Sequence, residues 1–196
     1  MKQIITISRQ YASGGRTIGA KVAERLGYAF YDTQIIRDTM RKTGLAAQTV
    51  EDTEQRVTNS FLFNLVMGVD LARNNVKKIE QAERELIHSY VKQGPCVIVG
   101  RSANFVLQEA AQAQVLNAYI YAGKAERLAY ALRHYDTDEK RARQRIEQTD
   151  KERRLYTASF YGKEWGDKQS YDLLLNSGRL GIETCVDLLC RAAEAE

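Results

Sequence analysis

The sequence predicts an α/β fold in which a mostly parallel sheet is covered by helices on both faces. Short apolar runs, typical of buried parallel strands, alternate with longer segments whose apolar residues recur at helical spacing. A glycine-bearing turn separates the first apolar run from the first helical segment, as at the start of a βαβ unit. The 196 residues are expected to form one domain, because a chain of this length can bury a full core.

Each expected strand and helix follows from its own local pattern. The first run, residues 4–7, is rich in β-branched residues and is followed by a helical stripe of Ile18, Val22 and Leu26. Gly27 then ends the helix. Residues 50–93 are mostly helical in pattern. The strands are expected at residues 3–7, 28–31, 96–99, 118–122 and 172–176, and further helices at 34–42, 124–135, 138–154 and 182–193.

The composition excludes several classes of protein. One Pro, 13 Gly and 44% hydrophobic residues do not fit a disordered or fibrous chain. Apolar runs are far shorter than the ~18 residues of a membrane helix, and the chain starts without a signal-peptide pattern. Cys96, Cys185 and Cys190 show no metal-site spacing and no disulfide framework. We therefore expect a cytoplasmic protein with reduced thiols and no membrane partner.

The positive charge of the chain is concentrated near its start. The net charge is only +4, but residues 1–50 hold eight basic and three acidic side chains, and the other 146 hold 21 and 22. The basic residues of this segment are mostly arginines, whose forked guanidinium suits phosphate oxygens. A nucleic-acid surface would give a larger overall excess, so a nucleic-acid partner is not expected. The distribution indicates a local anion site.

The turn at residues 13–17 reads Ser-Gly-Gly-Arg-Thr and has the composition of a phosphate-binding loop. Such a loop holds phosphate oxygens with backbone N–H groups at the start of a helix. In the P-loop pattern G-x-x-x-x-G-K-[ST], Gln10 here replaces the first Gly and Arg16 replaces the Lys. Arg16 can still contact phosphate through two N–H groups, and Thr17 can place its hydroxyl on Mg²⁺.

Two alternatives to a phosphate loop stay open. The glycines can simply form a tight strand-to-helix turn. The second alternative is a dinucleotide-binding turn, although the glycines at 14, 15 and 19 do not match the pattern G-x-G-x-x-G. Asp32 follows the second strand, where an acid can bind a sugar hydroxyl or Mg²⁺, and it can equally cap the next helix.

Other candidate residues follow from position. Ligands of a parallel sheet bind beyond the carboxyl ends of its strands, which selects Arg101 after the best strand. Basic residues between 133 and 154 alternate with acids, so most are expected to be solvated and one or two to reach a phosphate. An apolar stripe at Phe61, Leu65 and Val69 is typical of a core or of a subunit interface, which leaves a homodimer open. Five aromatic residues are more typical of loop packing than of base stacking: Tyr156, Phe160, Tyr161, Trp165 and Tyr171.

Several segments, in order along nearly the whole chain, resemble the bacterial cytidylate kinase-like family. The first covers residues 4–16 and includes the glycine turn. The others are residues 30–32 (Phe-Tyr-Asp), 96–104 (Cys-Val-Ile-Val-Gly-Arg-Ser-Ala-Asn), 149–156, 161–167 and 171–173. Their order makes the resemblance far more specific than any one segment.

The resemblance implies a three-layer P-loop kinase fold with a five-stranded parallel sheet. It implies a helical monophosphate-binding region at residues 33–93, an arginine-bearing lid at 133–166, and transfer of the ATP γ-phosphoryl group to CMP or dCMP with Mg²⁺. The implied roles are as follows: Ser13, Gly14, Gly15, Arg16 and Thr17 bind ATP; Asp32, Thr33, Arg101 and Ser102 lie at the acceptor nucleotide; Arg153 or Arg154 belongs to the lid; and Thr17 and Asp32 are the metal candidates.

The sequence also departs from authentic cytidylate kinases. They have a P-loop Lys, an Asp just before the Gly-Arg pair, and a nucleotide-contacting Asp just after it. This chain has Arg16 or Gly15 at the first place, depending on a one-residue shift in the alignment, and Val99 and Ser102 at the other two. Two functions therefore stay open, a nucleotide kinase and a regulatory protein that binds a nucleotide without turnover.

Overall fold

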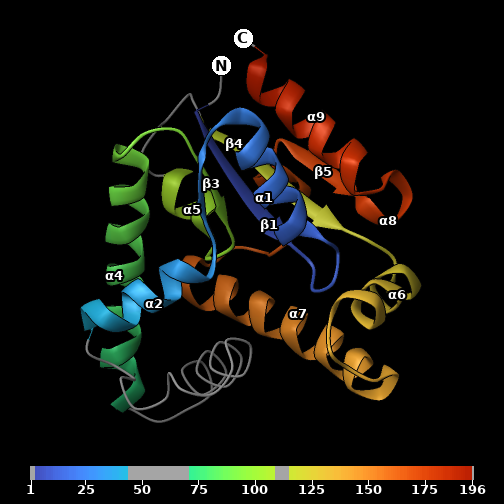
Figure 1. Cartoon of the computed structure of the whole chain (residues 1–196). Helices are drawn as coiled ribbons and strands as arrows, with labels where there is room; N and C mark the ends of the chain where they lie inside the picture. Colours follow the sequence, from blue (N-terminus) through green and yellow to red (C-terminus); the bar gives the residue numbers. More distant parts are fainter. Residues whose placement is uncertain (1–2, 44–70, 109–114, 196) are drawn as a thin grey trace.

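A computed structural model describes residues 3–43, 71–108 and 115–195, which contain a five-stranded, all-parallel sheet (Figure 1). The strand order is β2-β3-β1-β4-β5. This arrangement confirms the predicted α/β fold. The strands are β1 (Ile4–Arg9), β2 (Ala29–Tyr31), β3 (Cys96–Val99), β4 (Val115–Tyr121) and β5 (Leu173–Asn176).

β1 lies at the centre of the sheet, paired with β3 on one side and β4 on the other. Ile5 and Ile7 belong to one buried cluster, and Ile4 belongs to the cluster on the opposite face. Because both faces of the strand are covered, it is apolar throughout rather than alternating. β4 begins at Val115, earlier than predicted. The polar Asn117 interrupts its apolar pattern, but the Asn117 side chain is used within the sheet, where Oδ1 accepts a 2.7 Å hydrogen bond from Thr6.

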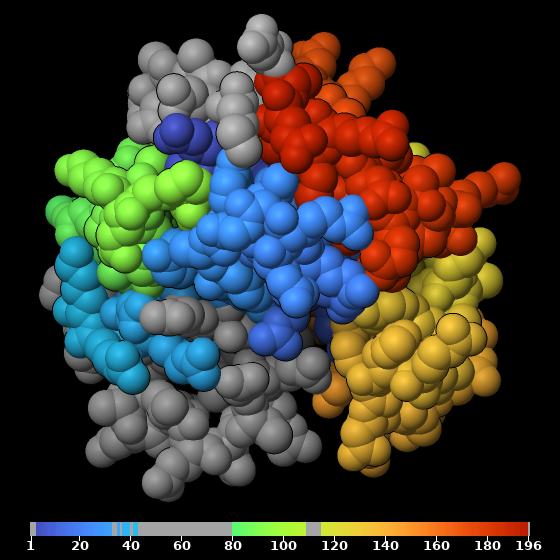
Figure 2. Space-filling view, turned by 45° about the horizontal axis from the view of Figure 1, so that its top comes forward, coloured from blue at the N-terminus to red at the C-terminus, as the bar shows by residue number. Residues whose placement is uncertain are grey.

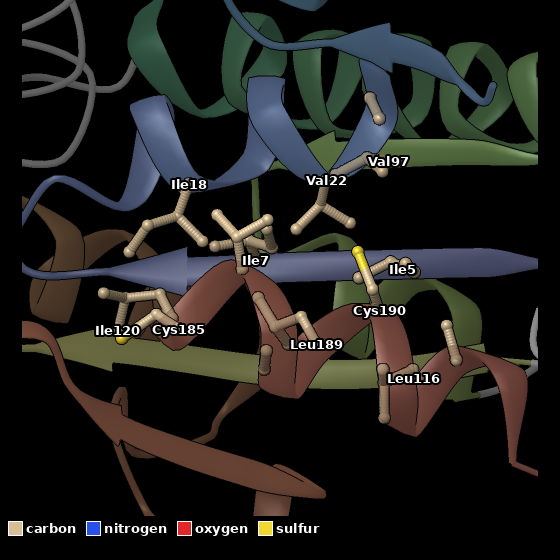
Figure 3. Close-up of a cluster of buried hydrophobic side chains, with 14 of the residues drawn as sticks. Ile5, Ile7, Ile18, Val22, Val97, Leu116, Ile120, Cys185, Leu189 and Cys190 are labelled. Carbon is tan, nitrogen blue, oxygen red and sulfur yellow. The ribbon is translucent and has the colours of Figure 1, made fainter. Parts of the chain in front are cut away.

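Helices α1 (Gly15–Leu26) and α9 (Ile182–Glu194) cover the first face of the sheet. Figure 3 shows Ile18 and Val22 of α1 pointing toward β1, with Leu189 of α9 packed beside them. These side chains are fully buried, so α1 is fixed where it follows the glycine turn. On the surface between the two helices, Lys21 pairs with Glu183 at 2.6 Å. Figure 2 shows the segment of α1 at the centre of this face, with the segments of α9 and α6 next to each other on one side of it.

Helices α2 (Thr33–Thr43), α4 (Leu71–Lys92) and α5 (Ala103–Gln108) cover the second face. Buried side chains from these helices pack on Ile4, Cys96 and Ile98 of the sheet. The structure is therefore the three-layer arrangement that was predicted. The helical region expected at 33–93 is described only in α2 and α4, and the stripe at Phe61, Leu65 and Val69 lies outside the described residues.

Helix α7 (Glu139–Tyr161) crosses the carboxyl ends of the strands, and α6 (Lys124–His134) packs against it (Figure 1). The predicted helix ended at residue 154, but α7 continues to Tyr161 because no helix-breaking residue stands before Gly162. A 3₁₀ turn at Lys168–Ser170 and the short helix α8 (Ser177–Leu180) flank β5. No helix in the described residues is long and apolar enough to cross a membrane.

The five candidate aromatic residues pack within the protein. Tyr156 and Tyr171 are buried, and Trp165 packs edge-on against Tyr119 at 5.4 Å between ring centroids. Phe160 lies 4.4 Å from the Tyr156 ring, and Tyr161 lies 5.9 Å from that of Phe105. This arrangement fits the packing interpretation rather than base stacking.

The close packing of α1 on the sheet makes Gly19 sensitive to substitution. A Cβ at Gly19 would lie 2.7 Å from Val99 Cγ2 and 3.2 Å from Ile7 Cδ1. Gly19→Val is expected to lower the free energy of unfolding by about 1–3 kcal/mol, because neither neighbour can move without disturbing the sheet. Urea unfolding measures this loss. Ala20→Val, on the exposed side of the same helix, is the control and should change stability by about 0.5 kcal/mol or less. Equal losses in the two variants would contradict the packing argument.

Candidate active site

The turn between β1 and α1 has the backbone geometry of a phosphate loop. Ala12 and Gly14 both have left-handed backbone angles, with φ of 58° and 74°. Gly14 caps α1 without a side-chain hydrogen bond, and the first turn of α1 carries no acid. A Cβ at Gly15 would lie 2.6 Å from Arg9 Cβ, so the loop passes close to the end of β1. The start of α1 therefore offers backbone N–H groups to an anion, as predicted for this segment.

Ser13 holds the loop in shape. Its hydroxyl donates to the carbonyl oxygens of Gln10 at 2.9 Å and Ile120 at 3.2 Å, and the side chain is buried. The Ser177 hydroxyl donates to the Ser13 carbonyl at 2.6 Å. The Ser13 side chain is thus used inside the protein, and its contribution to the candidate site is the conformation of the loop.

Arg16 and Thr17 lie in the exposed first turn of α1. Arg16 Nε lies 2.5 Å from Asp32 Oδ2, and the rest of the Arg16 side chain is largely solvent-exposed. The Thr17 hydroxyl lies 2.9 Å from the Tyr130 hydroxyl of α6. The structure therefore brings the phosphate loop and Asp32 together, although they come from β1 and β2.

Asp32 is a buried carboxylate directly after β2. Besides Arg16, it faces Arg9, whose Nη2 lies 3.7 Å from Oδ1. Two guanidinium groups on one carboxylate explain how this charge is tolerated with its side chain only 7% exposed. Thr33 follows as the first residue of α2.

Arg101 lies directly beyond the carboxyl end of β3, in a strained segment. Gly100, Arg101 and Ser102 have φ of 88°, 55° and 48°, a costly conformation for the two non-glycine residues. Arg101 Nη1 lies 3.4 Å from Glu83 Oε1 on α4, and the guanidinium carbon lies 5.8 Å from the Tyr156 ring centroid. The Ser102 hydroxyl lies 3.0 Å from that of Thr157 on α7, so Ser102 is used in packing α7 against the segment.

Glu83 is a buried acid that holds Arg101 in place. Its other oxygen accepts a hydrogen bond from the Tyr156 hydroxyl. Burial raises the pKa of Glu83, against the opposing effects of Arg101 and of the Tyr156 hydrogen bond, while the nearby Glu80 raises it further.

The raised pKa of Glu83 predicts a pH-dependent stability. A folded-state pKa above the unfolded value means that the folded protein binds the proton more tightly. The contribution of Glu83 to the free energy of unfolding is therefore complete below the ordinary Glu pKa. It decreases as the pH rises through the folded-state pKa. Glu83→Gln is expected to flatten this decrease, as measured by the melting temperature across a pH series. Identical pH profiles for the two proteins would contradict the expectation.

Helix α7 places Arg153 and Arg154 in different surroundings. Arg153 Nη1 donates to the Arg9 carbonyl at 2.6 Å and lies 3.9 Å from Asp150 Oδ1. Arg154 is exposed. Consecutive helical residues point about 100° apart, so one helix cannot turn both toward the strands. Of the two lid candidates, the structure brings Arg153 to the phosphate loop.

Three residues of the site were missed by the sequence analysis. Arg9 follows a strand end, but the sequence carries no sign of where its side chain points. Arg127 and Asp150 form a buried ion pair at 2.5 Å, and Asp150 also accepts a 2.8 Å hydrogen bond from the backbone of Tyr11 in the phosphate loop. Their separation of 23 residues gives no local signal that they pair.

The positive charges of the site act on one another. Burial, together with Arg153 and Arg101, lowers the pKa of Arg9 to about 9, while Asp32 opposes the change. Burial also lowers the pKa of Arg153, with Asp150 opposing. An anion bound between the two guanidinium groups would relieve their mutual repulsion.

The site fits a nucleotide phosphate better than it fits an all-protein metal centre. Among the described residues, no group of three or more His, Cys, Asp or Glu side chains could hold a metal. Mg²⁺ is typically held by one or two protein oxygens plus phosphate oxygens and water, and the exposed Thr17 hydroxyl fits that role. Asp32 stays a candidate ligand: its Oδ2 is buried and, among the described residues, accepts no hydrogen bond, although two guanidinium groups face the carboxylate.

Comparisons with known proteins agree with this fold. Among solved structures, the chain is similar to an uncharacterized protein from Eubacterium ventriosum, with 20% identity over 98% of this chain and 99% of that chain and a TM-score of 0.72. It is similar to a Thermus thermophilus protein, with 14% identity over 100% and 98% of the two chains and a TM-score of 0.58. For shikimate kinase from Bacteroides thetaiotaomicron, identity is 15% over 100% of both chains and the TM-score is 0.55.

These likenesses, with the strand order, show a P-loop kinase fold. No curated protein matches the sequence. The sequence profile of the cytidylate kinase-like family matches residues 4–179, which include the phosphate loop, Asp32, Arg101 and Arg153. Because this match spans most of the chain, the protein belongs to the cytidylate kinase-like family.

Proposed function

We propose that the protein transfers the γ-phosphoryl group of ATP to a nucleoside monophosphate such as CMP or dCMP, with Mg²⁺, in the cytoplasm. The observation that carries this proposal is that Asp32, Arg101 and Arg153, from three other parts of the fold, lie around Arg9 at the end of β1, next to the phosphate loop, with Asp32 also paired with Arg16. Phosphoryl transfer needs positive charge and in-line positioning rather than a covalent intermediate, and this arrangement supplies positive charge.

The proposal gives each residue a role. Gly14, Gly15 and Thr17 bind the ATP phosphates through the start of α1, and Arg16 neutralises charge on the transferred group. Bound Mg²⁺ would neutralise charge on the phosphate oxygens, with Thr17 as its protein ligand. Asp32 holds Arg16, as their 2.5 Å ion pair indicates.

The acceptor side uses other elements of the fold. Thr33 and Ser102 flank the acceptor nucleotide, and Arg101 binds its phosphate. Arg153 lies on α7, within residues 133–166, which the family resemblance assigns to the lid. It adds a positive charge beside the phosphates. A homodimer stays a prediction.

The experiment that tests the function measures ADP release. The protein is incubated with Mg-ATP and a panel of nucleoside monophosphates and nucleosides. ADP formation with a pyrimidine monophosphate is the expected result. If ATP raises the melting temperature but no acceptor produces ADP, the protein binds a nucleotide without turnover, and the kinase proposal is wrong.

A further inference from the structure

The side chain of Arg9 runs from the phosphate loop toward the acceptor side of the site. A Cβ at Gly15 would press on Arg9 Cβ and Cγ, at 2.6 and 3.0 Å. At its other end the guanidinium lies against Gly100, so closely that a Cβ there would clash with Arg9 Nη1. Gly100 directly precedes Arg101. The absence of a side chain at both glycines leaves room for Arg9 to reach from the end of β1 to the end of β3.

The guanidinium of Arg9 is largely buried, yet its ion pair with a carboxylate is long. Its side chain is 21% exposed, and its ion pair to Asp32 spans 3.7 Å, beyond hydrogen-bond range. Asp32 is also the closer partner of Arg16, at 2.5 Å. Within residues 3–43, 71–108 and 115–195, no other carboxylate pairs with Arg9. Its planar fork of N–H donors therefore has capacity for an oxygen-rich ligand.

The ion pairs around Arg9 have an excess of positive charge. Asp32 is shared by Arg9 and Arg16, and Asp150 is shared by Arg127 and Arg153. In the described part of the chain, this group contains five guanidinium groups and three carboxylates: Arg9, Arg16, Arg101, Arg127 and Arg153, with Asp32, Glu83 and Asp150. This excess of guanidinium groups over carboxylates favours an anionic ligand, and a phosphate monoester carries about 1.5 to 2 negative charges at neutral pH.

We propose that Arg9 is a phosphate-binding residue, and that its guanidinium, with those of Arg101 and Arg153, holds the phosphate of the acceptor as a dianion. This inference rests on the proposed function and deepens it, since it makes a phosphate on the acceptor a requirement of the site. Arg101 directly follows β3 and Arg153 lies on α7, and the charges of both act on the Arg9 guanidinium. An acceptor without the phosphate would leave the excess positive charge of the site uncompensated, so we expect that a nucleoside is not a substrate.

The test measures phosphate binding apart from turnover. Wild type, Arg9→Met, Arg9→Lys and the control Arg191→Met, an exposed arginine of α9, are titrated with inorganic phosphate and CMP, with melting temperature as the readout. Arg9→Met is expected to weaken binding of both about 10- to 100-fold, because charge-assisted hydrogen bonds are lost. Arg9→Lys should recover part of the loss, and Arg191→Met should bind as wild type does.

Steady-state assays then separate the two proposals. Arg9→Met should raise KM for the monophosphate about 10-fold or more, with KM for ATP little changed. Unchanged phosphate binding and unchanged KM in Arg9→Met overturn the role of Arg9, even if the wild type is a kinase. If the wild type has no kinase activity but binds phosphate through Arg9, the proposed function fails and the anion site stands.

A variant that does not fold is replaced by a measurement on the wild type. The structure of the wild-type protein is determined with inorganic phosphate at saturating concentration. A phosphate oxygen within about 3 Å of an Arg9 guanidinium nitrogen is the expected result. A structure without an anion on Arg9 overturns the proposal.

Discussion

Arg127→Met is expected to lower the free energy of unfolding by about 3–5 kcal/mol, the largest stability effect that we predict. Arg127 and Asp150 are 5% and 4% exposed, and their ion pair spans 2.5 Å. Removing the guanidinium leaves the Asp150 carboxylate buried, with Arg153 as its remaining ion-pair partner at 3.9 Å. Because Asp150 also binds the backbone N–H of Tyr11, the damage reaches the phosphate loop, and ATP binding should weaken as well.

Urea unfolding of matched variants isolates this effect. Arg127→Met/Asp150→Asn should be more stable than Arg127→Met alone, because the unpaired charge is gone and the amide oxygen can still accept from Tyr11. The control Arg143→Met removes the exposed ion-pair partner of Glu139 on α7, the helix that carries Asp150. It should change the free energy of unfolding little. A loss in Arg127→Met no greater than that in Arg143→Met would show that the buried pair does not stabilise the fold.

Arg16→Ala is expected to reduce kcat about 10²- to 10³-fold, the largest effect on activity that we predict. In the proposed mechanism Arg16 faces charge that spreads over the transferred phosphoryl group, and the variant leaves Asp32 as an anion close to that group. The loss should appear in kcat more than in KM, because the interaction strengthens in the transition state.

Two variants support the interpretation of Arg16→Ala. Arg16→Lys restores the residue that ordinary P-loops have and should recover part of the activity. Arg191→Ala removes an exposed arginine on α9 and should retain wild-type kcat. Turnover in Arg16→Ala within a few-fold of wild type would exclude a catalytic role for this side chain.

The fold could be predicted from the sequence because its strands are short, apolar and separated by clear helical patterns. The errors were at the ends of elements and in two short helices that were not predicted, α5 and α8. β4 begins at Val115 because the Asn117 side chain is satisfied by Thr6 from the neighbouring strand. α7 reaches Tyr161 because its buried residues, such as Tyr156, are fixed by tertiary contacts with Glu83.

The site could be predicted only in part. Position at strand ends indicated Asp32 and Arg101, and the structure brings both to the same edge of the sheet as the phosphate loop. The local pattern could not distinguish Arg153 from Arg154, because the direction of a helix face depends on its packing. Arg9 stayed unrecognised, since its side chain lies against Gly100 and near the charges of Asp32, Arg101 and Arg153, which are distant in the sequence.

The measurement that tests the central claim most directly follows the γ-phosphoryl group itself. ATP labelled at the γ-phosphorus is incubated with the protein, Mg²⁺ and CMP, and the products are separated. We predict that the label appears in the nucleoside diphosphate, and that cytidine in place of CMP yields no labelled nucleotide. Label that stays in ATP, or that appears only as free phosphate with every nucleoside monophosphate supplied, would contradict the assignment of this site to phosphoryl transfer between nucleotides.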